Sequence, residues 1–238
     1  MRKILRFSAI IMLIAGLCVF CYPIVLKLKF NIQKNNLIDS FNNLREEIRQ
    51  EINFTPESEG ELPYKELRQA MLEYNEKLFL NGQEKLVDQL SYEKAVFFPE
   101  DYGLKSDILG YISIPSIDVE LPIFNGASVE NMSKGATYLV NTSLPIAGEN
   151  TNCVIAAHTR DRGIYMFKRI TELKTGDEIK ITNFWETLVY KVTDTKIIYP
   201  DDIQSIRIQE GKQLLTLSTC YPYPENYQRY LVYAELVP

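Results

Sequence analysis

From residue 108 onward the chain is a succession of short segments rich in β-branched and aromatic residues, separated by Gly, Pro and Asn. Segments of this length and composition predict β-strands. Many short strands joined by turn residues are typical of a barrel. We therefore predict a mainly β fold, a closed or half-closed β-barrel with short helices. The expected strands are 108–114, 119–124, 152–158, 178–182, 187–199, 213–220 and 228–236, with one helix near 165–173.

The N-terminus has a different character. The 20 residues from Phe7 to Leu26 carry no charge, and about 20 apolar residues span the hydrocarbon core of a bilayer. Arg2, Lys3 and Arg6 precede this segment, and basic flanks remain on the cytoplasmic side. We predict a cytoplasmic tail at 1–6, a single transmembrane anchor at 7–26 and all later residues outside the cell membrane.

A cleaved signal peptide is the alternative for the same segment. No small-x-small cleavage site is evident, and Tyr22-Pro23 stands where one would be needed. The uncleaved anchor is therefore preferred.

Between the anchor and the predicted barrel, residues 27–106 are expected to be largely helical. Apolar residues recur every three or four positions up to Ile52, and a second helix is predicted over 64–80. Pro56 and residues 58–63 separate the two. Residues 83–106 are expected to form a loop or short helix. The apolar residues of the first helix are Leu37, Phe41, Leu44, Ile48 and Ile52.

The charge balance excludes one class of partner. Removing the three basic residues of positions 1–26 from the 26 in the chain leaves 23 basic against 31 acidic side chains, a net charge of −8. Binding to nucleic acid depends on neutralising phosphates, so no nucleic acid is expected as a partner.

Two cysteines, Cys153 and Cys220, lie beyond the membrane segment. They are candidates for one disulfide, as is usual in an exported protein. A single pair is nevertheless no disulfide framework in a domain of this size. The alternative is an unpaired thiol with a chemical role.

Three residues at predicted strand ends are candidates for chemistry. His158, the one histidine of the chain, ends an apolar strand, Cys220 ends another, and Arg229 opens the last strand nine positions later. Each taken alone is more often structural: a half-buried histidine, a small buried thiol or a solvated arginine.

Taken together, these three side chains suit acyl transfer. A thiolate attacks a carbonyl, and an imidazole can accept the thiol proton and later protonate a leaving amine. A guanidinium can stabilise the oxyanion of the tetrahedral intermediate. No Asp or Glu obviously orients His158, so a Cys-His-Asp triad is not the natural interpretation.

The motifs around these residues resemble the sortase family. TLSTC at Thr216–Cys220, followed by Arg229 on the next strand and preceded by AAH at Ala156–His158, matches that family's signature in order, spacing and strand position. Residues 108–126 and 141–158 also resemble the family. The resemblance covers roughly 107–236. It implies a sortase-type barrel over 107–238, with Cys220 as nucleophile, His158 as acid and base and Arg229 as oxyanion stabiliser, and no cofactor or metal.

Within the family, the residues resemble class C, the pilin polymerases. TCYPY at 219–223, SLPIAGE at 143–149 and IIYPDD at 197–202 carry this likeness. Class B is disfavoured because only Pro200–Lys212 stands where its long helical insertion would be. The sequence departs from class C in two respects. It has no Asp-Pro between 60 and 107, where the class carries a lid motif, and no C-terminal membrane helix before Pro238. A class D-like or unclassified sortase that anchors proteins to the cell wall therefore stays open.

The resemblance also implies substrate and partners. The expected substrate is a secreted surface protein or pilin bearing a Leu-Pro-x-Thr-Gly-type sorting signal, and the acceptor is an amine of a pilin lysine or a cell-wall peptide. A secreted cysteine peptidase that only hydrolyses and a silent β-barrel binding module are the alternatives. Candidate substrate-binding residues are Thr219 beside the nucleophile and Ile203, Ile206 and Ile208 in the preceding loop; packing of these isoleucines onto the barrel is an equal alternative.

Residues 83–106 stand where class C sortases carry a lid over the active-site groove. Tyr92, Phe97 and Phe98 are candidates to cover such a groove. Alternatively, these aromatic residues fasten the helical segment to the outside of the barrel.

Overall fold

The computed structural model describes residues 2–51, 64–86, 94–104, 106–161 and 163–237. Its main element is a closed eight-stranded barrel with strand order β1-β2-β3-β4-β9-β10-β8-β7. The mainly β prediction is therefore confirmed. The barrel strands are β1 (Ile108–Ile114), β2 (Val119–Phe124), β3 (Ala136–Tyr138), β4 (Thr151–Ala156), β7 (Glu178–Thr182), β8 (Thr187–Ile198), β9 (Gln213–Tyr221) and β10 (Gln228–Leu236).

Four predicted strands have the bounds expected from the sequence, namely β1, β2, β7 and β10. Two others differ by one residue, since β8 ends at Ile198 and β9 runs on to Tyr221. The predicted strand 152–158 is β4, which begins at Thr151 and ends at Ala156. Beyond Ala156, the Thr159 hydroxyl donates to the Cys220 carbonyl at 2.6 Å.

Several short elements were not expected from the sequence. Helix α3 (Val129–Lys134) leads into β3, which pairs parallel to β2. The hairpin of β5 (Arg160–Asp161) and β6 (Ile164–Tyr165) forms a separate two-stranded sheet. The predicted helix near 165–173 is only the short 3-10 helix η4 (Lys168–Glu172), because Tyr165 belongs to β6. The other 3-10 helices are η2 (Pro99–Tyr102), η3 (Pro115–Ile117) and η5 (Ile203–Ile206).

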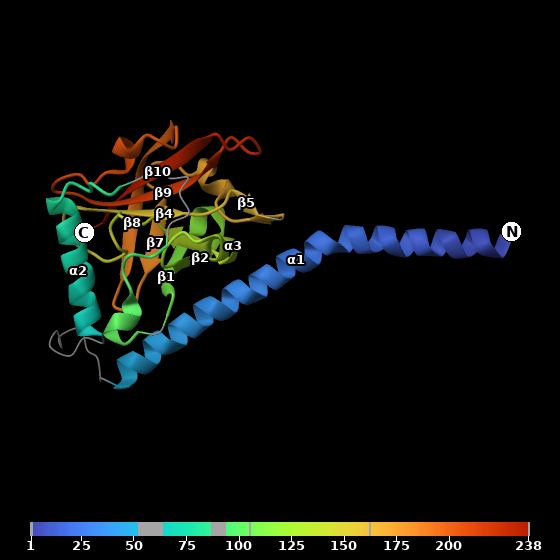
Figure 1. The fold of residues 1–238 in the computed structure, drawn as a ribbon, viewed down its shortest axis with the longest axis horizontal. Helices are drawn as coiled ribbons and strands as arrows, with labels where there is room; N and C mark the ends of the chain where they lie inside the picture. The colour runs from blue at the N-terminus through green and yellow to red at the C-terminus, as the bar shows by residue number, and fades with distance from the viewer. Residues whose placement is uncertain (1, 52–63, 87–93, 105, 162, 238) are drawn as a thin grey trace.

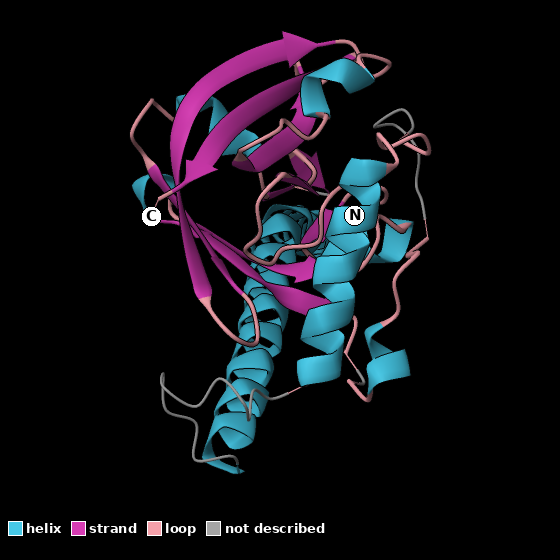
Figure 2. Ribbon diagram, turned by 90° about the vertical axis from the view of Figure 1, so that its left-hand side faces the viewer, coloured by secondary structure: helices cyan, strands magenta, loops and turns pink. Residues whose placement is uncertain are grey.

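Two long helices lie beside the barrel (Figures 1 and 2). Helix α1 (Arg2–Glu51) is continuous through Pro23, and α2 (Lys65–Leu80) begins one residue after the predicted start. The predicted break at Pro56 and 58–63 lies outside the described residues. Both helices contribute to the barrel's main hydrophobic core, through Phe30 and Phe41 of α1 and Leu67 and Met71 of α2.

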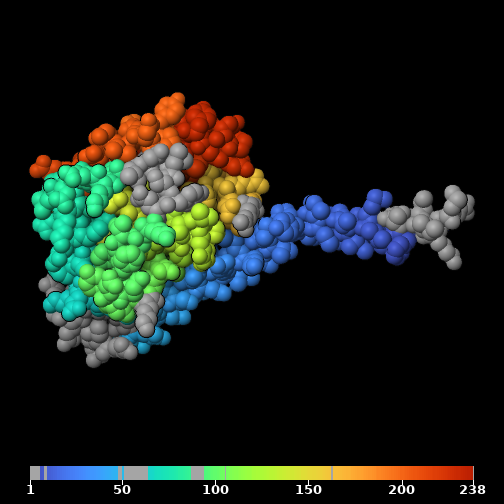
Figure 3. Space-filling view, in the orientation of Figure 1, coloured from blue at the N-terminus to red at the C-terminus, as the bar shows by residue number. Residues whose placement is uncertain are grey.

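The N-terminal part of α1 stands clear of the rest of the molecule (Figure 3). Its apolar side chains are exposed, for example Leu13 at 73% and Val19 at 75%. The helix is long and apolar enough to cross a membrane. This agrees with the predicted anchor at 7–26.

The candidate lid, residues 83–106, lies partly outside the described residues, since 87–93, including Tyr92, and 105 are not described. Phe97 is buried in the main core, its ring stacked on Tyr102 with centroids 5.7 Å apart and edge-on to Tyr74 of α2. Its carbonyl accepts from Asn125 Nδ2 at 2.8 Å. Phe97 therefore fastens this segment to the body of the molecule, whereas Phe98 is 45% exposed.

Candidate active site

Cys220 and Arg229 are brought together by the β9–β10 hairpin. The two residues are direct partners in the antiparallel ladder. Residues directly opposite each other in such a ladder place their side chains on the same face of the sheet. Arg229, nine positions after Cys220 in the sequence, therefore stands at the level of Cys220 in the barrel.

His158 reaches the same level through the parallel pairing of β4 with β9. Ala156 is the partner of Ser218 in that ladder, and His158 and Cys220 each stand two residues beyond this pair. The Ala157 N–H still donates to the Ser218 carbonyl at 3.3 Å, and the His158 carbonyl accepts from Phe167 N at 3.0 Å. All three predicted catalytic residues thus lie at one end of three adjacent strands.

Two threonines fix the spacing between the histidine and cysteine segments. The Thr159 hydroxyl donates to the Cys220 carbonyl at 2.6 Å and lies 2.9 Å from the Thr219 hydroxyl. Thr219 in turn donates to the Ala157 carbonyl at 2.9 Å. Thr219, a predicted substrate-binding residue, is buried and occupied by these bonds. Thr159 had no distinct signal in the sequence beyond its place directly after His158.

The charge state of His158 is set by burial and by a neighbouring carboxylate. Burial lowers the pKa of the imidazole below its ordinary value, and the charge of Asp161 partly offsets this by raising it. Desolvation disfavours the charged form of a base, so the neutral imidazole is favoured. Asp161, which had no distinct signal in the sequence, is therefore the carboxylate whose charge raises the pKa of His158.

The two cysteines outside α1 differ sharply. Cys153 is buried in the main core, and burial raises the pKa of its thiol far above the ordinary range. Cys220 is half-buried, and both thiols are free. Cys153 pairs with Leu215, five residues before Cys220 on β9. That separation is about 16 Å at the usual rise of a strand, well beyond the reach of a disulfide.

Arg229 is 4% exposed, so it is not a solvated surface arginine. Its Nη1 donates to the carbonyls of Gln228 at 2.8 Å and Asn226 at 3.2 Å, which fixes the guanidinium against the β9–β10 turn. Arginine has five N–H donors in a planar fork. Among the described residues no acceptor is bonded to Nε or Nη2, so these atoms retain three donors for a further acceptor.

The loop between β8 and β9, residues 199–212, covers the sheet face next to these residues. Ile206 is 1% exposed in a second hydrophobic cluster with Ile198 and Leu231. Ile198 is itself the ladder partner of Arg229. Ile206 thus packs the loop onto the barrel and offers no free surface. Ile203 and Ile208 are half-buried.

A buried glutamine of the helical segment holds the same loop. Gln83, two residues after the α2 C-cap Asn81, accepts from Ile208 N at 2.8 Å and donates to the Asn141 carbonyl at 3.2 Å. Arg207 Nη1 donates to the Gly82 carbonyl at 2.8 Å. The turn after α2 therefore links the β8–β9 loop to the segment before β4, a connection with no signal in the sequence.

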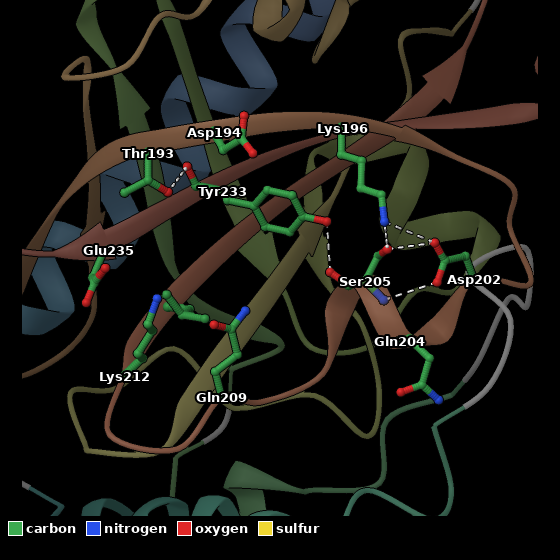
Figure 4. Close-up of a pocket in the computed structure, with 11 residues that line it drawn as sticks. Thr193, Asp194, Lys196, Asp202, Gln204, Ser205, Gln209, Lys212, Tyr233 and Glu235 are labelled. Atoms are coloured by element: carbon green, nitrogen blue, oxygen red, sulfur yellow. Dashed lines mark hydrogen bonds and ion pairs between the residues drawn. The ribbon is translucent and has the colours of Figure 1, made fainter.

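A polar pocket of about 460 Å³ is lined by residues of this loop and of strands β8, β9 and β10 (Figure 4). Ser205 of η5 is one of them: its hydroxyl donates to Asp202 at 2.6 Å and accepts from Lys196 at 2.7 Å, and its carbonyl accepts from the Tyr233 hydroxyl at 2.9 Å. The lining residues do not include Cys220, His158 or Arg229. These bonds tie η5 to Lys196 of β8 and Tyr233 of β10, in addition to the bond from Ile208 to Gln83.

The family model described as Sortase domain matches residues 112–237, which contain the whole of this constellation. The chain belongs to the sortase family. Sortase D of Bacillus subtilis (strain 168) is 33% identical over 174 residues, covering 72% of this sortase and 82% of the relative. Homologues named sortase are cysteine transpeptidases, and this chain is an enzyme of that type.

Solved structures support the same assignment. Sortase C from Clostridium perfringens SM101 matches with a TM-score of 0.65 and 34% identity, over 84% of this sortase and 99% of that chain. The pilus-related sortase C of Group B Streptococcus matches with a TM-score of 0.66 and 34% identity, over 74% of this sortase and 90% of that chain. Likeness to class C structures is therefore confirmed at the level of the fold.

Proposed function

We propose that this sortase cleaves a Leu-Pro-x-Thr-Gly-type sorting signal and transfers the acyl product to an amine. The observation that carries the proposal is the register at one barrel end, where His158, Cys220 and Arg229 stand level on adjacent strands. A further support is the Clostridium perfringens sortase C solved with the C-terminal cell wall sorting motif, 35% identical to this chain with a TM-score of 0.65.

In the first step, His158 accepts the proton of the Cys220 thiol as Sγ attacks the threonine carbonyl carbon, and the carbonyl oxygen becomes an oxyanion. The free donors of Arg229 stabilise that charge. The intermediate collapses to a thioester as the Thr–Gly amide bond breaks, and His158 supplies the proton that the departing amine needs.

In the second step an incoming amine attacks the thioester carbon. His158 accepts the proton of the attacking nitrogen, and the new amide forms as the Cys220 thiolate leaves. Aminolysis must compete with water, so the site needs shielding from solvent. The β8–β9 loop beside Arg229 is the element placed to bind substrate and provide that shielding.

The favoured acceptor is a pilin lysine. The two solved structures described above are both sortases C, and the one from Group B Streptococcus is pilus-related. A cell-wall peptide is the second candidate, because sortase D of Bacillus subtilis is similar over most of its own length. We further propose that residues 7–26 of α1 anchor the enzyme in the cell membrane with the barrel outside.

The test is product analysis by mass spectrometry with full-length enzyme and a Leu-Pro-x-Thr-Gly peptide. Separate reactions contain no acceptor, a lysine-bearing pilin-like peptide or a glycine-bearing wall-type peptide, with Cys220→Ala as the control. We expect an amide-linked product with an acceptor. Hydrolysed peptide alone in every reaction would contradict transpeptidation, and a wall-type product alone would favour the second candidate.

A further inference from the structure

The path of α1 along the barrel relates the membrane anchor to the active site. Near its C-terminus, Phe41 packs against Phe184 with ring centroids 4.6 Å apart, and Arg45 Nε donates to the Phe184 carbonyl at 3.3 Å. Phe184 lies in the β7–β8 turn. The adjoining Asn183 bonds the Pro145 carbonyl at 2.9 Å, in the segment before β4. This is the barrel end opposite Cys220.

Toward its N-terminus, α1 reaches the catalytic end. It contacts β6, which follows His158 by a few residues. Phe30 of α1 is buried in the main core, and Ile164 of β6 packs against that core. Figure 1 shows the N-terminal half of α1 leaving the body on the side of the β5 hairpin. The helix thus passes from the far end of the barrel to the catalytic end and continues outward from there.

The catalytic end is also close to the proposed membrane boundary. Leu26 is the last residue of the uncharged segment and Phe30 is already 8% exposed in the core. At a rise of about 1.5 Å per residue, roughly 6 Å of helix separates them. Because α1 is one continuous helix from Leu26 to Phe30, no flexible linker would let the catalytic end rotate away from the membrane.

The surface at this end carries exposed tyrosines. Tyr165, Tyr223 and Tyr227 are 50%, 47% and 55% exposed. The Arg160 guanidinium lies 5.4 Å from the Tyr165 ring centroid and 6.0 Å from that of Tyr223, and Lys168 Nζ lies 4.2 Å from Tyr165. We name these five residues the tyrosine patch. They come from the β5–β6 hairpin, η4 and the β9–β10 turn, which flank His158 and Cys220.

This chemistry fits the headgroup region of a bilayer. Tyrosine is enriched there because its ring is apolar and its hydroxyl is hydrated, and lysine and arginine place their charge beside lipid phosphates. Asp161, half-buried, and Glu225, exposed, also lie at this end. Their charges oppose those of Arg160 and Lys168, so within the described residues of the patch we assign the attraction to the tyrosines.

We propose that the catalytic end of the barrel faces the bilayer that holds α1, with the tyrosine patch in its headgroup region. The proposal rests on the membrane anchorage proposed above. The active site then opens toward the lipid surface. Contact of the patch with lipid then favours a sorting signal presented at that surface over the same signal free in solution.

The first test locates the patch relative to lipid. Full-length chain carrying Cys18→Ala, Cys21→Ala and Cys220→Ala receives a fluorophore at Tyr223→Cys or, as a control, at Lys191→Cys. Lys191 is exposed on β8 and lies toward the barrel end opposite Cys220. Each is placed in nanodiscs of phosphatidylcholine and phosphatidylglycerol containing a nitroxide-headgroup lipid. We expect several-fold stronger quenching at position 223. If the chain stays with the discs but quenching is equal at both positions, or absent, the proposed orientation is wrong and the membrane anchorage stands. Chain that elutes free of the discs overturns the anchorage as well.

The second test concerns substrate choice. Tyr165→Ser combined with Lys168→Ser is compared with Lys191→Ser in proteoliposomes, using a sorting-signal protein anchored in the same vesicles and a soluble peptide with the same signal. The double variant should cleave the anchored protein about tenfold more slowly, the change that corresponds to a loss of about 1.4 kcal/mol in interfacial binding. Cleavage of the soluble peptide should match the unmodified enzyme. An equal loss on both substrates, or no loss on the anchored one, would contradict the proposal.

Discussion

Cys220 and Arg229 face each other across the β9–β10 ladder, on the same sheet face and one hairpin turn apart. The pairing fixes the positions of both residues through the strand ladder and not through a loop. Arg229 Nη1 is bonded to two carbonyls of the turn, which leaves the rest of its planar fork for the reaction.

This relationship predicts the effect of a conservative substitution. Arg229→Lys keeps the charge but loses the planar fork, so kcat should fall by roughly 10² or more, the loss expected for an oxyanion donor. Steady-state kinetics with the sorting-signal peptide measures it, and Arg169→Lys in η4 is the matched control. A lysine variant with unreduced kcat would mean that the oxyanion is stabilised elsewhere.

The contrast between the two thiols gives a second prediction. Cys220→Ala should abolish the acyl-enzyme seen by mass spectrometry while the thermal unfolding midpoint stays close to that of the unmodified enzyme, because the side chain is only half-buried. Cys153→Ala should retain the acyl-enzyme, since its thiol is buried in the core and remains protonated. Acyl transfer by the Cys220→Ala variant would assign the nucleophile to another residue.

His158 is the one histidine in the chain, so its titration can be followed by NMR without ambiguity. Burial, partly offset by Asp161, lowers its pKa, and we expect a value below the ordinary 6.5. Asp161→Asn removes the raising effect of the carboxylate and should lower the pKa further. A higher His158 pKa in the Asp161→Asn variant would show that the negative charge of Asp161 does not raise the pKa of the imidazole.

The same shift has a consequence for stability. With its pKa lowered in the folded state, His158 binds a proton more readily when unfolded, so its contribution to the free energy of unfolding declines as pH falls below about 6.5 and recovers as pH rises. Denaturant unfolding of the unmodified enzyme and His158→Gln across this range isolates the effect. A difference between the two that does not vary with pH would contradict it.

The link from Gln83 to the β8–β9 loop predicts a positioning effect. Gln83→Ala leaves the Ile208 N–H and the Asn141 carbonyl without their partner and should cost about 1–3 kcal/mol in the free energy of unfolding. Because the loop borders the site, KM for the peptide should rise while kcat changes little.

Two further variants separate positioning from general destabilisation. Gln83→Glu retains the acceptor for Ile208 N and should restore part of the KM. Gln69→Ala, at an exposed position of α2 bonded to Glu73, should change neither constant. If kcat falls as much as kcat/KM in Gln83→Ala and glutamate gives no rescue, Gln83 has a structural role only.

The sequence by itself determined the local elements and the candidate chemistry. Strands such as β1 and β10 were predicted at their observed bounds because alternation and β-branched residues are local properties of the chain. The three catalytic candidates were recognisable for the same reason, since each sits at the end of a segment with a strong strand pattern. The uncharged run from Phe7 likewise determined a membrane-length helix.

Tertiary structure decided how these pieces meet. Strand β3 has three residues, too few to show a period, yet its pairing with β2 and β4 closes the barrel. The bonds from Thr159 to Cys220 and from Gln83 to Ile208 join residues 61 and 125 positions apart. Direct pairing of side chains at such separations depends on the folded path of the chain, which no local pattern encodes. The direction in which the active site faces relative to α1 was decided in the same way, by packing of Phe30 and Phe41 against the barrel.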